Sequence, residues 1–184
     1  MPTPIGHALG GLTVAWLSPG RHSRTLVAAC VGAAVAADLD ILIHDHRSYT
    51  HSAGAVIVVG VMVWAIAQLP AFAKAPSGEK LRPTSSHSAA ALGLTIAAAY
   101  ATHIVLDWLG KDTAVPFGLP ALWPFSSSYY ISNANLFMEI SRRYWKPDEF
   151  IVGNLKAGAW ELLVLGPIAA LAWALQRNAN HRGR

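Results

Sequence analysis

Histidine and aspartate residues gather near the ends of the apolar runs of this chain. If successive runs are helices that alternate in direction, six of these residues fall at one end of a bundle. They are three imidazoles and three carboxylates: His7, Asp38, Asp40, His51, His103 and Asp107. This mixture of metal ligands suits Zn²⁺, Mn²⁺ or Fe²⁺ and could hold one or two ions. A metal ion of this kind lowers the pKa of bound water and polarises an ester or phosphoryl oxygen, so the expected chemistry is hydrolysis.

The spacing of these residues along the chain supports a shared site. His103 and Asp107 are four residues apart, which on a helix places both side chains on one face. Asp38 and Asp40 are two residues apart and cannot share a helix face, so we expect one of them at or beyond a helix end. Two plainer interpretations stay open. Either aspartate could be a solvated end residue, and the His103–Asp107 pair could be a hydrogen bond that closes a helix.

The short connection before His51 contains further polar side chains. His44 and His46 could be metal ligands or exposed loop residues. Arg47 could hold a negatively charged group of a substrate, or it could pair with an aspartate. Among the carboxylates, Asp38 or Asp107 is the expected general base.

Five apolar runs must position these groups. The run 52–73 has neither charge nor histidine and is long enough, as a helix, to cross a hydrocarbon layer of about 30 Å. Ser52 or Thr50 suits the N-cap of that helix. The other runs are 5–17, which could be short or partly buried, 25–37, 83–106 and 162–176. We therefore predict an all-α integral membrane helix bundle with four or five membrane helices.

The composition agrees with a membrane protein. Apolar residue types make up 53% of the 184 residues and charged types only 13%, about half of the ~25% found in soluble domains. The mean hydropathy is +0.36. These values exclude a disordered chain, a nucleic-acid-binding tail and an ordinary soluble enzyme, and no nucleic-acid partner is expected. The length suits one domain, 1–184, and the single cysteine, Cys30, is expected to pack as a small apolar residue.

The segment 110–156 has no long apolar run but contains about half of the tryptophan, tyrosine and phenylalanine residues. Aromatic residues of this kind favour the boundary between membrane and water. We expect the segment to form an interfacial lid, with an amphipathic helix over 135–146. A loop that caps the bundle is the alternative.

Loop charge predicts how the chain is oriented in the membrane. Lysine and arginine are slightly more numerous at the bundle end that carries 74–86 than at the end that carries 110–156. Because cytoplasmic loops are richer in these residues, we expect 74–86 in the cytoplasm. The histidine–aspartate cluster would then face the non-cytoplasmic side.

The motifs together resemble a known family. They are an early His7 before a Gly/Ala-rich run, Asp38-Leu39-Asp40, the run 46–52 (His-Arg-Ser-Tyr-Thr-His-Ser), His103 to Asp107, and Trp123-Pro124-Phe125-Ser126. They resemble the LexA-binding, inner-membrane-associated hydrolases, also described as membrane-bound metal-dependent hydrolases. The resemblance covers about residues 2–128, and 46–52 is its most specific part. Ala37 departs from the family, which usually has proline there.

The resemblance implies a function and a set of ligands. The family is distantly similar to the zinc-dependent phospholipase C group, which implies zinc and a phosphoester or ester of a lipid-like substrate in the membrane. The implied metal ligands are His7, Asp38 or Asp40, His51, His103 and Asp107. Two alternatives remain, a non-catalytic membrane scaffold or regulator and a metal-ion or proton transporter. Clustering at one membrane face argues against transport, which needs ionisable groups through the depth of the membrane. The residues identify no protein partner.

Overall fold

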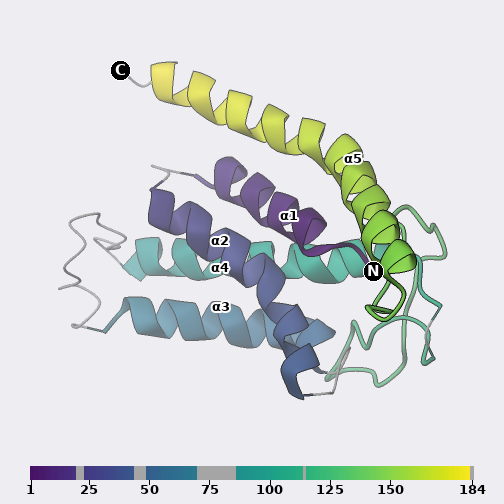
Figure 1. Cartoon of the computed structure of the whole chain (residues 1–184). Helices are drawn as coiled ribbons and strands as arrows, with labels where there is room; N and C mark the ends of the chain where they lie inside the picture. The colour runs from purple at the N-terminus through teal and green to yellow at the C-terminus, as the bar shows by residue number, and fades with distance from the viewer. Residues whose placement is uncertain (20–22, 44–48, 70–85, 114, 183–184) are drawn as a thin grey trace.

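The computed structural model describes residues 1–19, 23–43, 49–69, 86–113 and 115–182, and within them the chain is helical (Figure 1). The elements are α1 (Pro4–Leu17), α2 (Arg24–Ala36), η1 (Ala37–Ile43), η2 (Tyr49–His51), α3 (Ala53–Ala67), α4 (Ser86–Leu109) and α5 (Pro147–Arg182), where η marks a 3₁₀ helix. The only β pairing in these ranges consists of two isolated bridges, Gly110–Phe137 and Leu119–Tyr130. The prediction of an all-α fold is confirmed.

Side-chain caps define where three of the helices begin. Thr3, Ser23 and Ser52 each accept a hydrogen bond from a backbone N–H in the first turn of the following helix. A cap of this kind satisfies an amide that has no partner inside the helix. Ser52 therefore starts α3, as one of the two expected caps, and leaves His51 directly before the helix.

Helix α4 lies at the centre of the bundle, where it contacts α1, α2 and α3, and α5 packs along α1 (Figure 1). Small residues allow the close contacts. A Cβ atom at Gly93 of α4 would lie 2.7 Å from the backbone oxygen of Gly60 in α3, and such close approach is typical of helices packed in membranes. Cys30 is fully buried in the core beside Ile96, which confirms the expected packing role.

Two helices are long and apolar enough to cross a membrane: α4, over Ala89–Leu109, and α5, over Pro147–Ala179. Helix α3 is a shorter apolar helix, and residues 70–85, which follow it, lie outside the described part of the chain. Helices α1 and α2 have 14 and 13 residues, or about 20 Å at 1.5 Å per residue, less than the hydrocarbon layer of about 30 Å. The described residues thus provide two candidate spans, fewer than the four or five expected.

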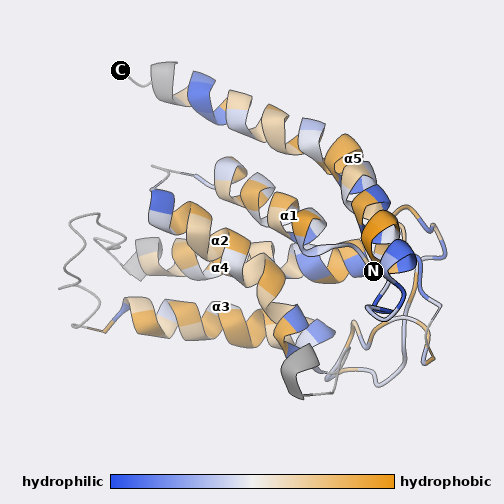
Figure 2. Ribbon diagram, in the orientation of Figure 1, coloured by the Kyte–Doolittle hydropathy of each residue, from blue (hydrophilic) through white to orange (hydrophobic). Residues whose placement is uncertain are grey.

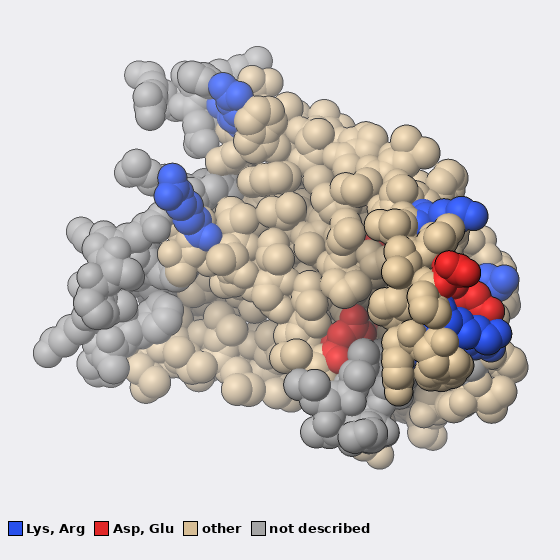
Figure 3. Space-filling model, viewed as in Figure 1, with Lys and Arg blue, Asp and Glu red and all other residues tan. Residues whose placement is uncertain are grey.

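Hydropathy and charge vary along the bundle. Apolar residues dominate the helices, and hydrophilic residues gather where α2 and α4 end and α5 begins (Figure 2). In the same view, lysine and arginine side chains lie toward the two ends of the bundle, and most of the surface between them is uncharged (Figure 3). Large apolar side chains of α5, such as Leu163 and Leu171, are exposed on its outer face. Such an uncharged band suits contact with lipid.

The prediction of an amphipathic helix over 135–146 is wrong. The backbone there pairs with other parts of the chain, because Leu136 N–H donates to the carbonyl of Leu109 and the Phe137 carbonyl accepts from Lys111 N–H, both at 2.9 Å. Asn135 also has a positive φ of 47°, which a helix does not tolerate well. Phe137 is buried, so this part of the segment packs on the bundle as a loop.

The predicted boundary of the aromatic segment also moves. Helix α5 begins at Pro147 and so includes 147–156, which the sequence pattern places in the lid. Proline is favoured in the first turn of a helix, where its missing N–H costs nothing. Asp148 and Glu149 follow in the same turn, where negative charge is favoured by the helix dipole. The irregular segment therefore ends at residue 146, and the structure describes its residues 110–113 and 115–146.

Candidate metal centre

Four elements bring five of the predicted residues together at one end of the bundle. His7 lies in the first turns of α1, Asp38 in η1 directly after α2, and His51 at the end of η2. His103 and Asp107 come from the last turns of α4. The side chains are buried except that of Asp38, which is 18% exposed. The centre therefore opens to its surroundings on the side of Asp38.

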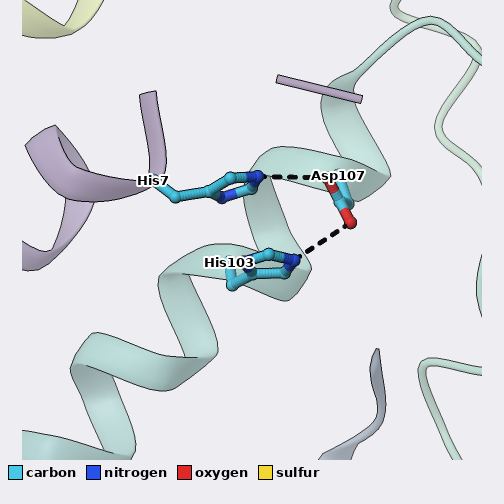
Figure 4. A group of neighbouring side chains, drawn as sticks. All are labelled: His7, His103 and Asp107. Carbon is cyan, nitrogen blue, oxygen red and sulfur yellow. Dashed lines mark ion pairs between the residues drawn. The ribbon is translucent and has the colours of Figure 1, made fainter. Parts of the chain in front are cut away.

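The Nε2 atoms of the three histidines face the two carboxylates. Asp107 Oδ2 lies 3.4 Å from His103 Nε2, and its Oδ1 lies 3.6 Å from His7 Nε2 (Figure 4). The same Oδ2 lies 3.4 Å from His51 Nε2. Asp38 Oδ1 lies 3.7 Å from His51 Nε2 and 3.6 Å from His103 Nε2. Asp38 Oδ2 lies 3.9 Å from His7 Nε2. The two imidazole nitrogens of His51 and His103 are 3.1 Å apart.

Contacts at Nδ1 orient two of the imidazoles. Nδ1 of His103 lies 2.8 Å from the carbonyl oxygen of Ala34 in α2, so it carries the proton and donates. Nδ1 of His51 lies 3.2 Å from Asp40 Oδ2 and 3.0 Å from the hydroxyl of Thr50. Partners at Nδ1 are the usual way in which proteins leave the Nε2 lone pair of a ligand histidine free. Both rings therefore present Nε2 to the centre.

The ionisation of His51 fits these contacts. Burial lowers the pKa of His51, but the neighbouring carboxylates of Asp38, Asp40 and Asp107 outweigh burial and raise the pKa to about 9. For Asp38, burial raises the pKa, whereas the nearby imidazoles of His51, His103 and His7 hold it below its usual value. A protonated His51 explains how its Nε2 can lie 3.1 Å from that of His103, because one of the two must donate.

Several polar atoms at the centre lack hydrogen-bond partners among the described residues. They are Nδ1 and Nε2 of His7, Oδ1 of Asp38, and Oδ1 and Oδ2 of Asp107. Buried polar groups are normally paired, so each such atom calls for an explanation. Metal bonds of about 2.1 Å with angles of about 90–120° place neighbouring ligand atoms about 3.0–3.6 Å apart. The observed separations of 3.1–3.9 Å are close to this range, so the donor set fits a divalent ion.

Two overlapping groups of side chains could each hold an ion: His7, His103 and Asp107, and Asp38, His51 and His103. Both groups need His103. Its Nδ1 is occupied by Ala34, so it has only Nε2 to offer. One shared centre fits this geometry better than two separate sites.

The remaining predicted residues lie in different places. Asp40 is buried, but its carboxylate contacts Nδ1 of His51 and the hydroxyl of Thr50, at the edge of the ring that faces away from the shared centre. Arg47, His44 and His46 lie outside the described residues. Sequence reasoning missed Glu161 of α5, which is fully buried. The available signal was one acidic residue at the edge of the apolar run 162–176.

The fold and the cluster define a class of protein: an all-helical membrane protein with a candidate metal centre at one end of its helices. The chain belongs to the YdjM inner membrane protein family, whose model matches residues 1–181. No curated protein and no solved structure matches the chain. The family supports the predicted location in an inner membrane.

Proposed function

We propose that this protein is a membrane-bound metal-dependent hydrolase whose ligands are His7, Asp38, His51, His103 and Asp107. One observation carries the proposal: buried imidazole nitrogens and carboxylate oxygens face one another, and several have no hydrogen-bond partner among the described residues. A divalent ion, with zinc expected first and manganese or iron as alternatives, supplies an acidified water and a polarised phosphoryl or acyl oxygen when bound.

The side chains around the centre have separable roles in this proposal. His51 and His103 present Nε2 because Asp40 and Ala34 hold their Nδ1 atoms. Asp38 is the only partly exposed carboxylate of the centre, so substrate reaches it first. We therefore assign the general base to Asp38, with Asp107 as the alternative. Both were candidates from sequence.

The irregular segment 110–146 supports a substrate at the membrane surface. Its Phe125, Tyr144 and Trp145 side chains are exposed, and aromatic residues favour the boundary between membrane and water. The segment also pairs with the end of α4 that carries Asp107, because Leu136 N–H donates to the carbonyl of Leu109 and Ser132 N–H donates to that of Trp108. We propose that it is a lid that contacts lipid head groups, and that the substrate is a phosphoester or ester of a lipid. Arg47 would hold a negative group of that substrate.

The arrangement in the membrane extends the same proposal. Helices α1 to α3 would lie in the membrane beside α4 and α5, giving the four or five membrane helices expected from sequence. The centre would face the non-cytoplasmic side of the inner membrane. This orientation rests on the loop charges.

A hydrolysis assay tests the proposed activity. Full-length protein in detergent, loaded with Zn²⁺, Mn²⁺ or Fe²⁺, is offered a panel of phospholipids, other phosphoesters and carboxylic esters. We expect turnover of at least one lipid-like substrate, and a loss of about 10³-fold or more in Asp107→Ala. Glu149→Ala, which removes an exposed carboxylate, is the matched control and should keep full activity. Metal-loaded protein that is inert toward the whole panel would favour the scaffold or regulator.

A further inference from the structure

A carboxylate outside the candidate centre, Glu161 of α5, holds the beginning of α1. Its Oε1 accepts a hydrogen bond of 2.6 Å from Thr3 N–H, and its Oε2 accepts one of 2.9 Å from Gly6 N–H. The Thr3 hydroxyl also donates to Oε2. The first amides of a helix have no partner inside it, and the positive end of the helix dipole favours a carboxylate. Glu161 therefore satisfies the amino-terminal end of α1 from a neighbouring helix.

The contact between α1 and α5 leaves no space for a side chain at two glycines. A Cβ atom at Gly6 would lie 2.8 Å from Oε2 of Glu161 and 3.2 Å from Cβ of Pro2. On α5, a Cβ atom at Gly158 would lie 3.3 Å from Ile5. The glycines at these two positions let Glu161 reach the backbone of α1 directly.

His7 follows Gly6 directly and differs from the other two imidazoles of the centre. Neither of its ring nitrogens has a hydrogen-bond partner among the described residues, whereas Nδ1 is engaged in both His51 and His103. Its ring stacks on that of His103, with centroids 3.7 Å apart. Because no hydrogen bond holds the ring itself, we expect the backbone of α1 to set where His7 lies.

We propose that Glu161 is a positioning residue that places His7 at the centre by holding Thr3 and Gly6. The contribution of Glu161 to metal binding rests on the proposed function, but its role in placing His7 does not. Removing the carboxylate should release the start of α1, and with it His7, while His51 and His103 keep their own partners.

Chemical modification of histidine tests this placement without any metal. Diethyl pyrocarbonate acylates accessible imidazoles, and peptide mass spectrometry gives the rate at each histidine in full-length protein kept in detergent with a chelator. The variant is Glu161→Gln. Its side-chain amide has one acceptor oxygen instead of two, and its NH₂ group would face an N–H donor of α1. Glu149→Gln makes the same change at an exposed position of the same helix, and it is the matched control.

We expect His7 to react about tenfold faster in Glu161→Gln, as local opening exposes it, with little change at His51 and His103 and none in Glu149→Gln. Unchanged reactivity at His7 would overturn the proposal, and so would an equal increase at all three histidines. Thr3→Val, which removes only the hydroxyl, should give a smaller increase at His7. Zn²⁺ titration of the same preparations separates the two claims: wild-type protein without Zn²⁺ affinity would count against the proposed function and leave the labelling result for His7 standing.

Discussion

At the scale of single residues, the two neighbouring aspartates of η1 hold His51 from opposite edges. Asp38 lies at its Nε2 and Asp40 at its Nδ1. The first contact faces the shared centre, and the second faces Thr50, whose hydroxyl donates to Asp40 at 2.8 Å. Two residues of identical chemistry, two positions apart, are therefore expected to have different roles. Asp38 would be a ligand, and Asp40 would orient a ligand.

Asparagine at position 40 tests that division. Asp40→Asn keeps the shape of the side chain but weakens the contact with Nδ1 of His51, so we expect Zn²⁺ affinity to fall by about 10–100-fold, as is usual for groups that orient a ligand. A competition titration against a chromophoric chelator measures the change. Asp107→Ala, which removes a ligand, should lose far more. Equal losses in the two variants would mean that Asp40 is itself a ligand, as the sequence also allowed.

Sequence spacing predicted some of these residues for a clear physical reason. His103 and Asp107 share a regular helix, so a separation of four fixes their common face. The orientation of Asp40 could not be predicted, because η1 turns more tightly than an α-helix and the pairing with Thr50 is tertiary. The role of Glu161 could not be predicted either, although its place at the edge of an apolar run marks it as unusual, because its partners are the backbone amides of Thr3 and Gly6, which are distant in the chain.

At the scale of elements, the irregular segment is tied to the start of α3 as well as to α4. Ala53 N–H donates to the carbonyl of Ala121, and Gly54 N–H donates to that of Trp123, both at 2.8 Å. The rings of Trp123 and Tyr49 lie 4.7 Å apart. These contacts hold the first turn of α3, and therefore the neighbouring His51, against the irregular segment.

Alanine at two glycines measures that attachment. A Cβ atom at Gly54 would lie 2.7 Å from the ring of Trp123, whereas one at Gly32 of α2 would meet no atom within 4 Å. We expect Gly54→Ala to destabilise the protein by about 1–3 kcal/mol through overpacking. Gly32→Ala should instead be neutral or more stable by about 0.5–1 kcal/mol, because alanine favours a helix. Thermal unfolding in detergent compares the two, and equal midpoints would show that Trp123 is not packed on α3.

The apolar runs predicted all five α-helices, because burial in lipid or in a small-residue core leaves long uncharged stretches. The residues at which these helices begin and end could be predicted less well. Helix α5 begins at Pro147, ahead of the apolar run 162–176, because Pro147, Asp148 and Glu149 suit a first helical turn and Asn154 hydrogen-bonds to the backbone of Ser141 in the irregular segment. The run 135–146 has helical spacing but no helix, because Leu136 pairs with Leu109 at the end of α4 and Phe137 pairs with Lys111.

At the scale of the whole molecule, the centre lies at one end of the bundle and the start of α2 at the other. Cysteine labelling in cells tests which end is outside. The single cysteine, Cys30, is buried, so the labelling of an introduced cysteine can be measured with little labelling of Cys30. We expect a membrane-impermeant maleimide to label Ser127→Cys, at an exposed position of the irregular segment, and to spare Thr25→Cys. The reverse pattern would place the centre in the cytoplasm.

The metal content of the intact protein tests the central claim most directly. Full-length protein in detergent is loaded with Zn²⁺ and freed of excess metal by gel filtration. Its zinc content per chain is then measured by elemental mass spectrometry. We expect about one zinc ion per chain in the wild type, removable by a chelator, and less than about a tenth of that in His103→Ala and Asp107→Ala when circular dichroism shows both still helical. Wild-type protein that keeps no metal, or variants that keep as much as the wild type, would contradict a metal centre formed by these residues.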